Sequence, residues 1–311
     1  MKNTLTSIAL FFIGACTHGQ GIAINADKLY PEGTAYSKKQ RMFFISSIYH
    51  GQVGTLDYEG NYKRFTDDAD LIASVGILAD EKHNILYVTN VDNGVAAKTN
   101  PATAYKLSEV IAFDLTTGKR KFSVDLGKLN AGQPNFINDL TMDAEGNVYV
   151  TNSFSPIIFR IDKDHKASVF ARNDSWKGEG FNLNGIVYHP DGYLIVAQSS
   201  KGILYKIDIK NPVDVKVIQV DEPVVGVDGI ILNGKNELVI MLNASSKILK
   251  LTTTDGWEHA RLANTKESAL PFPTTGVLVD GMNYILNGKL TELFDPQVKK
   301  ASNFFLQKVK F

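Results

Sequence analysis

The sequence predicts an all-β fold, a six-bladed β-propeller with four-stranded antiparallel blades, and three observations support this prediction. A short turn-like opening precedes an apolar strand six times, at intervals of roughly 40 residues apart from one longer gap. Tight turns join the successive apolar runs, and no convincing amphipathic helix pattern lies among them. The openings are Pro31-Glu32-Gly33, Ser74-Val75-Gly76, Asn138-Asp139-Leu140, Leu183-Asn184-Gly185, Val227-Asp228-Gly229 and Thr274-Thr275-Gly276.

Each predicted blade repeats the same order of strands. An apolar strand follows the opening, and a turn leads to a second strand, for which ILYVTN at 85–90 and VYVTN at 148–152 are close copies. The third strand, as at 157–161, begins to alternate apolar and polar residues, and the fourth, as at 166–170, is more polar. The period places the blades at about 28–66, 70–128, 136–171, 181–220, 226–263 and 274–311.

Length and composition agree with one folded domain over residues 21–311. The chain has 311 residues, of which 44% are hydrophobic, and no Pro/Ser/Gly-rich linker divides it. Its formal net charge is +0 and it has no basic run. Binding to phosphate backbones needs clustered Lys and Arg, so nucleic acid is not an expected partner.

Residues 1–20 are predicted to form a secretory signal peptide. Lys2 precedes an apolar stretch at 5–15 that is too short to span a bilayer as a stable helix. The end of this stretch, Ile13-Gly14-Ala15-Cys16, resembles a bacterial lipobox. Cys16 is either a lipidated first residue or an unused thiol in a discarded signal, and as the only cysteine it excludes an internal disulfide. Both alternatives predict an extracytoplasmic protein, which is secreted, periplasmic or anchored to a membrane only through Cys16.

Four of the six openings carry an oxygen ligand: Glu32, Asn138, Asn184 and Asp228. The innermost strands of a propeller start on one face of the disc, so these side chains are expected to converge around the central channel. Two carboxylates and two amide carbonyls suit Ca²⁺ or another divalent ion, and no Cys/His pattern predicts zinc. The alternative is that they are ordinary turn formers and a solvated loop carboxylate without a metal.

The ordered openings also resemble a known family. Pro31-Glu32-Gly33, Asn138-Asp139 followed by Met142-Asp143, Asn184-Gly185 and Asp228-Gly229 are similar to the signature positions of the senescence-marker-protein/gluconolactonase family. This family includes regucalcin and is related in fold to the paraoxonases. The resemblance covers most of the chain after about residue 28 and implies a six-bladed propeller with a divalent metal, usually calcium, that hydrolyses lactones or other esters. It also implies that Glu32, Asn184 and Asp228 bind the metal, that Asn138 contacts substrate or metal, and that Asp228 is the acid/base carboxylate.

The predicted mechanism is attack of water on a carbonyl that the metal polarises. Asp228 is the first candidate for the base and Asp139 the second. His50 lies in the turn after the second strand of the first blade, where it is either a base or substrate contact or simply exposed. No Gly-x-Ser-x-Gly elbow predicts a serine nucleophile.

Two further features concern the substrate. Phe136 stands where sugar-lactone hydrolases of the resembling family carry an Arg, which implies an apolar lactone or ester unless the ring only packs into the core. The segment 91–107 interrupts the second blade and is expected either to overhang the channel, with Asp92 and Tyr105 selecting substrate, or to be a surface insertion without a role. The sequence thus predicts a metal-dependent lactonase or esterase. The alternative is a non-catalytic propeller that keeps the metal for stability and acts as a binding or scaffold module.

Overall fold

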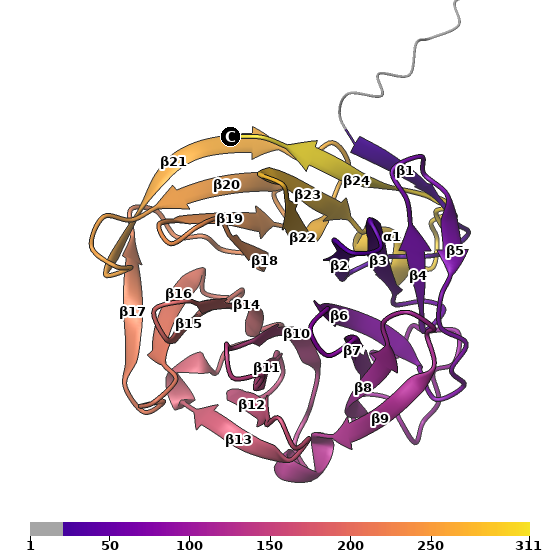
Figure 1. Cartoon of the computed structure of the whole chain (residues 1–311), viewed down its shortest axis with the longest axis horizontal. Coiled ribbons are helices and arrows are strands. Elements are labelled where there is room, and N and C mark those ends of the chain that lie inside the picture. Colours follow the sequence, from indigo (N-terminus) through magenta and orange to yellow (C-terminus); the bar gives the residue numbers. More distant parts are fainter. Residues whose placement is uncertain (1–20) are drawn as a thin grey trace, which may run out of the picture.

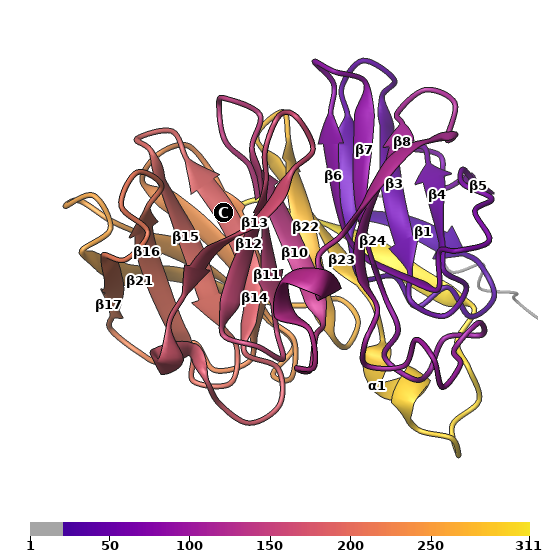
Figure 2. The same ribbon diagram turned by 90° about the horizontal axis from the view of Figure 1, so that it is seen from below.

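The computed structural model describes residues 21–311, and the predicted signal peptide with Cys16 lies outside them. Twisted antiparallel sheets surround a central axis, with the first strand of each run innermost (Figure 1). The predicted all-β propeller class with four-stranded antiparallel sheets is confirmed. Seen from the side, the sheets stand next to one another around the axis, and the short helix α1 lies at one end of the disc (Figure 2).

The first three sheets follow the chain in order, each with four antiparallel strands. The first contains β2 (Thr34–Ser37), β3 (Met42–Ser47), β4 (Gln52–Leu56) and β5 (Tyr62–Arg64). The second contains β6 (Ala73–Asp80), β7 (Ile85–Val91), β8 (Ser108–Asp114) and β9 (Arg120–Asp125). The third contains β10 (Ile137–Met142), β11 (Val148–Asn152), β12 (Ile157–Ile161) and β13 (Ala167–Arg172).

The next eight strands form one continuous sheet in place of two separate ones. It contains β14 (Leu183–His189), β15 (Tyr193–Gln198), β16 (Ile203–Asp208), β17 (Val215–Val220), β18 (Val227–Leu232), β19 (Glu237–Leu242), β20 (Lys247–Thr252) and β21 (His259–Glu267). Two antiparallel runs of four strands meet at their outer edges, where β17 and β21 pair in parallel over two residues, Gln219 with His259 and Val220 with Ala260.

The last sheet corrects the predicted limits of the last blade, which was expected at about 274–311. The C-terminal segment supplies only β22 (Pro273–Val279), β23 (Met282–Asn287) and β24 (Asn303–Val309). The fourth, outermost strand is β1 (Gly21–Asn25), which pairs with β24 and buries Ile22 and Ile24. Residues 21–25 therefore pair with the last strand and complete this sheet, a contact that the repeat period did not predict.

Burial follows the position of a strand within its sheet. Every residue of the second strands β7 and β15 is buried, because both of their faces pack against neighbouring sheets. The outer strand β21 is almost entirely exposed. This gradient explains the apolar runs of the second strands and the polar character of the fourth strands.

In the described part of the chain, three short helical segments complete the fold: the 3₁₀ turns η1 (Gly127–Asn130) and η2 (Asp174–Trp176), and α1 (Leu290–Phe294). No helix within residues 21–311 has the length and apolar character needed to cross a membrane.

Candidate functional site

The four predicted metal ligands line one pocket of about 360 Å³ at the centre of the ring. Asn138, Asn184 and Asp228 lie near the starts of the innermost strands β10, β14 and β18, and Glu32 lies just before β2. All four are at least nine-tenths buried. The structure thus brings together side chains that are far apart in the sequence.

A backbone irregularity directs three of these side chains, those of Asn138, Asn184 and Asp228, toward the pocket. The pairing of the first two strands shifts register between Ile137 and Leu140, between Leu183 and Ile186, and between Val227 and Ile230. Such β-bulges leave the intervening residues outside the regular ladder and change the direction of their side chains. The pairs Asn138-Asp139, Asn184-Gly185 and Asp228-Gly229 occupy these bulges, so the turn-like sequence signal marks a bulge at the site.

Hydroxyl groups of the second strands satisfy the backbone groups that the bulges release. Thr151 Oγ1 accepts a hydrogen bond from Asp139 N (3.2 Å) and donates to the carbonyl oxygen of Asn184 in the next sheet (2.7 Å). Thr89 Oγ1 accepts from Gly76 N (2.8 Å) and donates to the carbonyl oxygen of Asn138 (3.0 Å). Each hydroxyl therefore ties one bulge to the ligand residue of the following sheet.

Two residues that the sequence-based prediction missed orient the ligand side chains. Asn138 Nδ2 donates to Ser153 Oγ (3.1 Å), and Asn243 Nδ2 donates to Asp228 Oδ2 (3.2 Å). Ser153 directly follows β11 and Asn243 directly follows β19, so both occupy the same slot of the repeat. A comparison of the repeats at this slot was the signal available to find them.

The carboxylates of the site are buried without a cationic partner. Burial, and next the nearby charges of Asp228 and Asp139, raise the pKa of Glu32 well above its ordinary value. Burial raises the pKa of Asp228 to about 7, and hydrogen bonds from Asn243 and Asn184 oppose this rise. Within residues 21–311, neither side chain forms an ion pair with Lys, Arg or His. Buried charges require a partner, so the site calls for a proton or a cation.

The donor set fits a hard divalent ion. Asn138 Oδ1 is buried and accepts no hydrogen bond in the described part of the chain, while its Nδ2 is already engaged. An amide oxygen left free in this way, beside two buried carboxylates, matches the oxygen ligands of Ca²⁺. No group of three or more His, Cys, Asp or Glu side chains within 21–311 forms a candidate metal centre, so this site depends on its amides.

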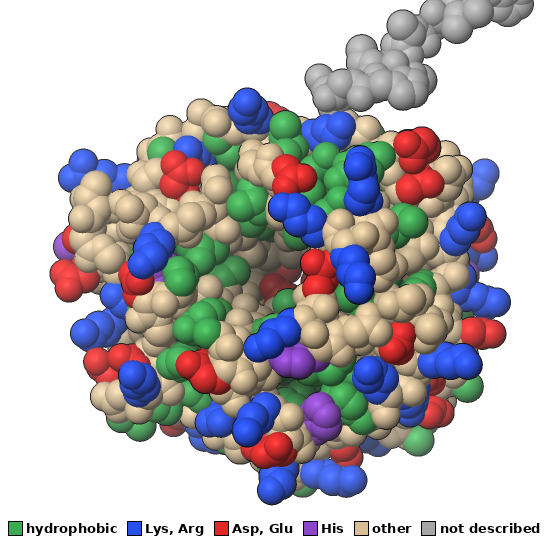
Figure 3. Space-filling view, viewed as in Figure 1, with side chains coloured by type: hydrophobic (Ala, Val, Ile, Leu, Met, Phe, Trp, Pro, Cys, Tyr) green, Lys and Arg blue, Asp and Glu red, His purple; other side chains and the backbone are tan. Residues whose placement is uncertain are grey.

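Asp139 faces another part of the channel. It lines a second pocket of about 230 Å³, to which all six innermost strands contribute, whereas the ligand pocket does not include it. Seen along the propeller axis, the surface is hollowed at its centre (Figure 3). Burial raises the pKa of Asp139 to about 6, against hydrogen bonds from Leu140 and Ile186. Its charge acts on Glu32 and Asp228, but its side chain lies outside the ligand pocket.

Three other candidate residues also lie outside the lining of the ligand pocket. A ring nitrogen of His50, Nε2, lies 2.7 Å from the carbonyl oxygen of Asp27. The carboxylate of Asp92 accepts hydrogen bonds from within its own loop, including those of Thr99 and Thr103. Tyr105 is 55% exposed. The structure therefore does not place His50, Asp92 or Tyr105 in the pocket that the four predicted metal ligands line.

One wall of the pocket is aromatic. The ring centroids of Phe136, Phe154 and Phe181 lie 5.1 to 5.3 Å apart in each pair. Phe136 is buried and lines the pocket, whereas Phe181 is 41% exposed at its edge. Leu290 and Phe294 of α1 also line the pocket. Only Phe136 was among the predicted substrate residues, because the contacts of the others depend on the fold.

The chain is similar, at low sequence identity, to proteins of several descriptions. No family model matches the chain. The major allergen Mal f 1 of Malassezia furfur is 22% identical over 275 residues, covering 80% of this chain and 78% of the allergen. The crystal structure of the allergen Mala s 1 of Malassezia sympodialis is 18% identical with a TM-score of 0.72, covering 92% of this chain and 95% of that one.

Two solved enzymes are similar at the level of the fold. A luciferin-regenerating enzyme is 14% identical with a TM-score of 0.66, covering 94% of this chain and 95% of its own. A gluconolactonase of Xanthomonas campestris is 14% identical with a TM-score of 0.64, covering 92% of this chain and 88% of its own. At these identities the likeness shows a shared propeller fold, of a kind that includes the gluconolactonase and the luciferin-regenerating enzyme.

Proposed function

We propose that this protein is a metal-dependent hydrolase of lactones or other carboxylic esters, with calcium or another divalent ion as cofactor. The observation that carries the proposal is the unpartnered oxygen of Asn138 in one pocket with buried Glu32 and Asp228. The fold-level likeness to a gluconolactonase supports the reaction class. We count the two four-stranded runs of the eight-stranded sheet as two blades, which makes the propeller six-bladed and the chain from 21 to 311 one domain.

The residues divide the chemistry among them. Glu32, Asn138, Asn184 and Asp228 would hold the ion, and a bound ion would polarise the carbonyl of the substrate. Asp228 takes the proton from the attacking water, and Asn243 fixes its carboxylate through the bond to Oδ2. Phe136 and Phe181 bind the apolar part of the substrate and exclude water. The partner is thus a small lactone or ester.

The alternative function is a metal-stabilised binding or scaffold module. The observation that favours it is the similarity to two proteins that are named only as allergens. A panel of lactones and aryl esters, assayed with calcium and with chelator, separates the two functions. Turnover that requires calcium supports the hydrolase, and ligand binding without turnover supports the module. In either case we propose an extracytoplasmic location, because the predicted signal and Cys16 precede the domain.

Chelation is expected to lower the melting temperature more at pH 8 than at pH 5. The raised pKa values of Glu32 and Asp228 mean that, without the ion, the folded state binds more protons than the unfolded chain between about pH 4 and 7. The apo protein therefore loses stability as pH rises through this window. Bound calcium replaces the protons and adds stability by mass action. Calorimetry with chelator, and with excess calcium restored as the control, measures the shift; an equal shift at both pH values contradicts the prediction.

Replacement of Phe181 by alanine is expected to reduce the preference for long acyl chains. In the native protein, kcat/KM is expected to rise with chain length in a lactone series, because the aromatic wall buries the chain. Phe181 is 41% exposed, so its loss leaves the fold intact. We expect a roughly tenfold fall for the longest lactone and little change for the shortest. Val217→Ala, a change at an exposed site on an outer strand, is the matched control. Equal effects across the series contradict the assignment.

A further inference from the structure

The segment between β7 and β8 contributes one residue to the ligand pocket. Asn93 lines the pocket and is 5% exposed. Its Oδ1 accepts no hydrogen bond in the part of the chain that the structure describes. A buried acceptor without a partner is unusual in proteins, and it is expected where a ligand supplies the missing donor. Asn93 is not one of the four predicted metal ligands, so the proposed metal site does not explain why its oxygen lacks a partner.

Asp92 fixes the backbone that carries Asn93. Its carboxylate accepts hydrogen bonds from Thr99 Oγ1 (2.7 Å), Thr103 Oγ1 (2.7 Å) and Gly94 N (2.9 Å). Although burial opposes ionisation, these bonds hold the pKa of Asp92 below its ordinary value. Asp92 therefore acts as the internal anchor of the loop, and the neighbouring Asn93 is held in place.

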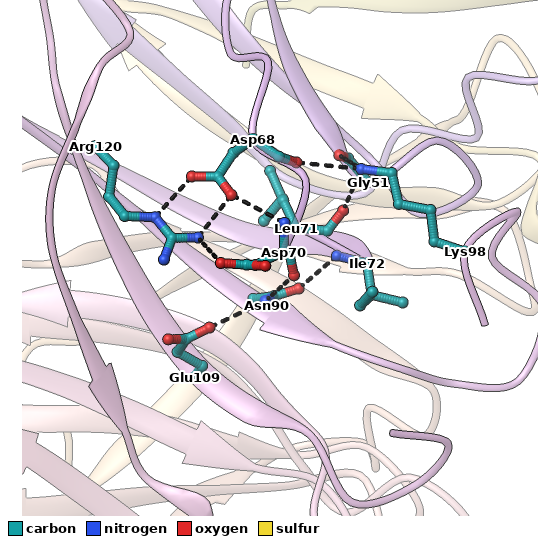
Figure 4. A network of polar contacts seen from close by, with 9 residues as sticks. All are labelled: Gly51, Asp68, Asp70, Leu71, Ile72, Asn90, Lys98, Glu109 and Arg120. Carbon is teal, nitrogen blue, oxygen red and sulfur yellow. Dashed lines mark hydrogen bonds and ion pairs between the residues drawn. The ribbon is translucent and has the colours of Figure 1, made fainter. Parts of the chain in front are cut away.

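Lys98 fastens the same loop to the connection between β5 and β6 (Figure 4). Its Nζ donates to the carbonyl oxygens of Leu71 (2.9 Å) and Asp68 (3.2 Å). The guanidinium of Arg120 forms two hydrogen bonds with the carboxylate of Asp68, which fixes the strand-to-strand connection that receives Lys98. The loop at 92–107 is thus held both by hydrogen bonds within it and by those of Lys98 to a neighbouring segment. Asn93 therefore belongs to a preorganised wall of the pocket.

We propose that Asn93 sets substrate specificity: its Oδ1 accepts a hydrogen bond from a hydroxyl or amide N–H of the substrate. The inference rests on the proposed function and names the substrate class, a lactone or ester with both an apolar body and a hydrogen-bond donor. The apolar body packs against Phe136 and Phe181, and the donor meets Asn93. An amide oxygen repels a carbonyl or ether oxygen and accepts only from a donor, so it discriminates between otherwise similar substrates.

The test compares two ketones that cannot be hydrolysed, α-hydroxycyclopentanone and cyclopentanone, titrated by NMR into the calcium-loaded protein. Native protein is expected to bind the hydroxyketone about tenfold more tightly. Asn93→Leu removes the acceptor at similar size and is expected to bring the ratio to about one, whereas Asn93→Asp keeps an acceptor and retains the preference. Asn264→Leu, at an exposed site on β21, is the matched control and leaves the ratio unchanged.

Calcium affinity and turnover distinguish the possible failures. Unchanged calcium affinity in Asn93→Leu supports a contact with substrate, and a large loss makes Asn93 a metal ligand and overturns the proposal. A native ratio near one, or an unchanged ratio in Asn93→Leu, also overturns it. If the hydroxyketone preference depends on Asn93 while α-hydroxy-γ-butyrolactone is not hydrolysed, the binding inference stands and the proposed hydrolase function fails.

Discussion

The Asp228→Asn protein is expected to hydrolyse lactones about 10³-fold more slowly than the native protein while keeping its fold. The amide cannot take a proton from water at neutral pH, and it offers the ion a neutral oxygen in place of a charged one. Calcium affinity is therefore also expected to fall, by tenfold or more. Steady-state kinetics at saturating calcium separate the loss of the base from the loss of the ion, because added calcium restores only the second.

The same substitution is expected to raise the melting temperature of the protein without metal. A neutral amide is cheaper to bury than the carboxylate, whose pKa burial raises to about 7. Apo Asp228→Asn is thus expected to melt above the apo native protein at pH 8. Asp221→Asn, a change at an exposed carboxylate, is the control and should leave both activity and melting unchanged. If Asp228→Asn hydrolyses lactones at the native rate, another group must be the base and the proposed mechanism is contradicted.

The repeated openings were sufficient to predict the class of fold and which side chains meet. Asn138, Asn184 and Asp228 occupy one slot of a repeat, and a repeat fixes where that slot lies in space. The sequence predicted Asn138 as a ligand and Asp139 as the second candidate for the base, but it did not predict that Asp139 would line a different pocket. Successive residues of a bulge point in different directions, and here only Asn138 faces the ligand pocket.

Other features depend on contacts that no local pattern records. Strand β1 pairs with β24, which lies far away in the sequence. The alternating pattern of residues 21–25 therefore did not predict their partner. Asp92 looked like a substrate residue because of its position in the insertion, but its oxygens are occupied by Thr99 and Thr103. The role of Asn93 became visible only through its burial and its unpartnered oxygen.

Close packing between neighbouring sheets explains two glycines of the openings. A Cβ atom at Gly185 would lie 2.3 Å from the carbonyl oxygen of Asp228 in the next innermost strand. At Gly76 the corresponding distance to the carbonyl oxygen of Asn138 is 2.4 Å. Each glycine thus permits a close approach that places the backbone of a ligand residue. The close approach of neighbouring innermost strands thus explains both why glycine occurs in these openings and where the ligand backbone lies.

Gly185→Ala is therefore expected to damage stability and metal binding together. The added methyl group meets backbone atoms, which cannot move aside as a flexible side chain does, so the sheets must separate at Asp228. We expect a loss of about 2 to 4 kcal/mol in the free energy of unfolding and a melting temperature lower by about 5 to 10 °C. Gly127→Ala is the control, since its nearest atom is a side-chain oxygen of Asp125 at 3.2 Å.

Calcium titration of folded Gly185→Ala measures whether the steric change reaches the site. Displacement of the Asp228 backbone turns its carboxylate away from the position that Asn243 fixes, so affinity for calcium is expected to fall by about tenfold even where the fold survives. A variant that loses stability but binds calcium as tightly as the native protein would show that the ligand side chains are positioned independently of the contact between sheets. Loss of both in Gly185→Ala, and of neither in Gly127→Ala, instead ties the spacing of the innermost strands directly to the geometry of the metal site.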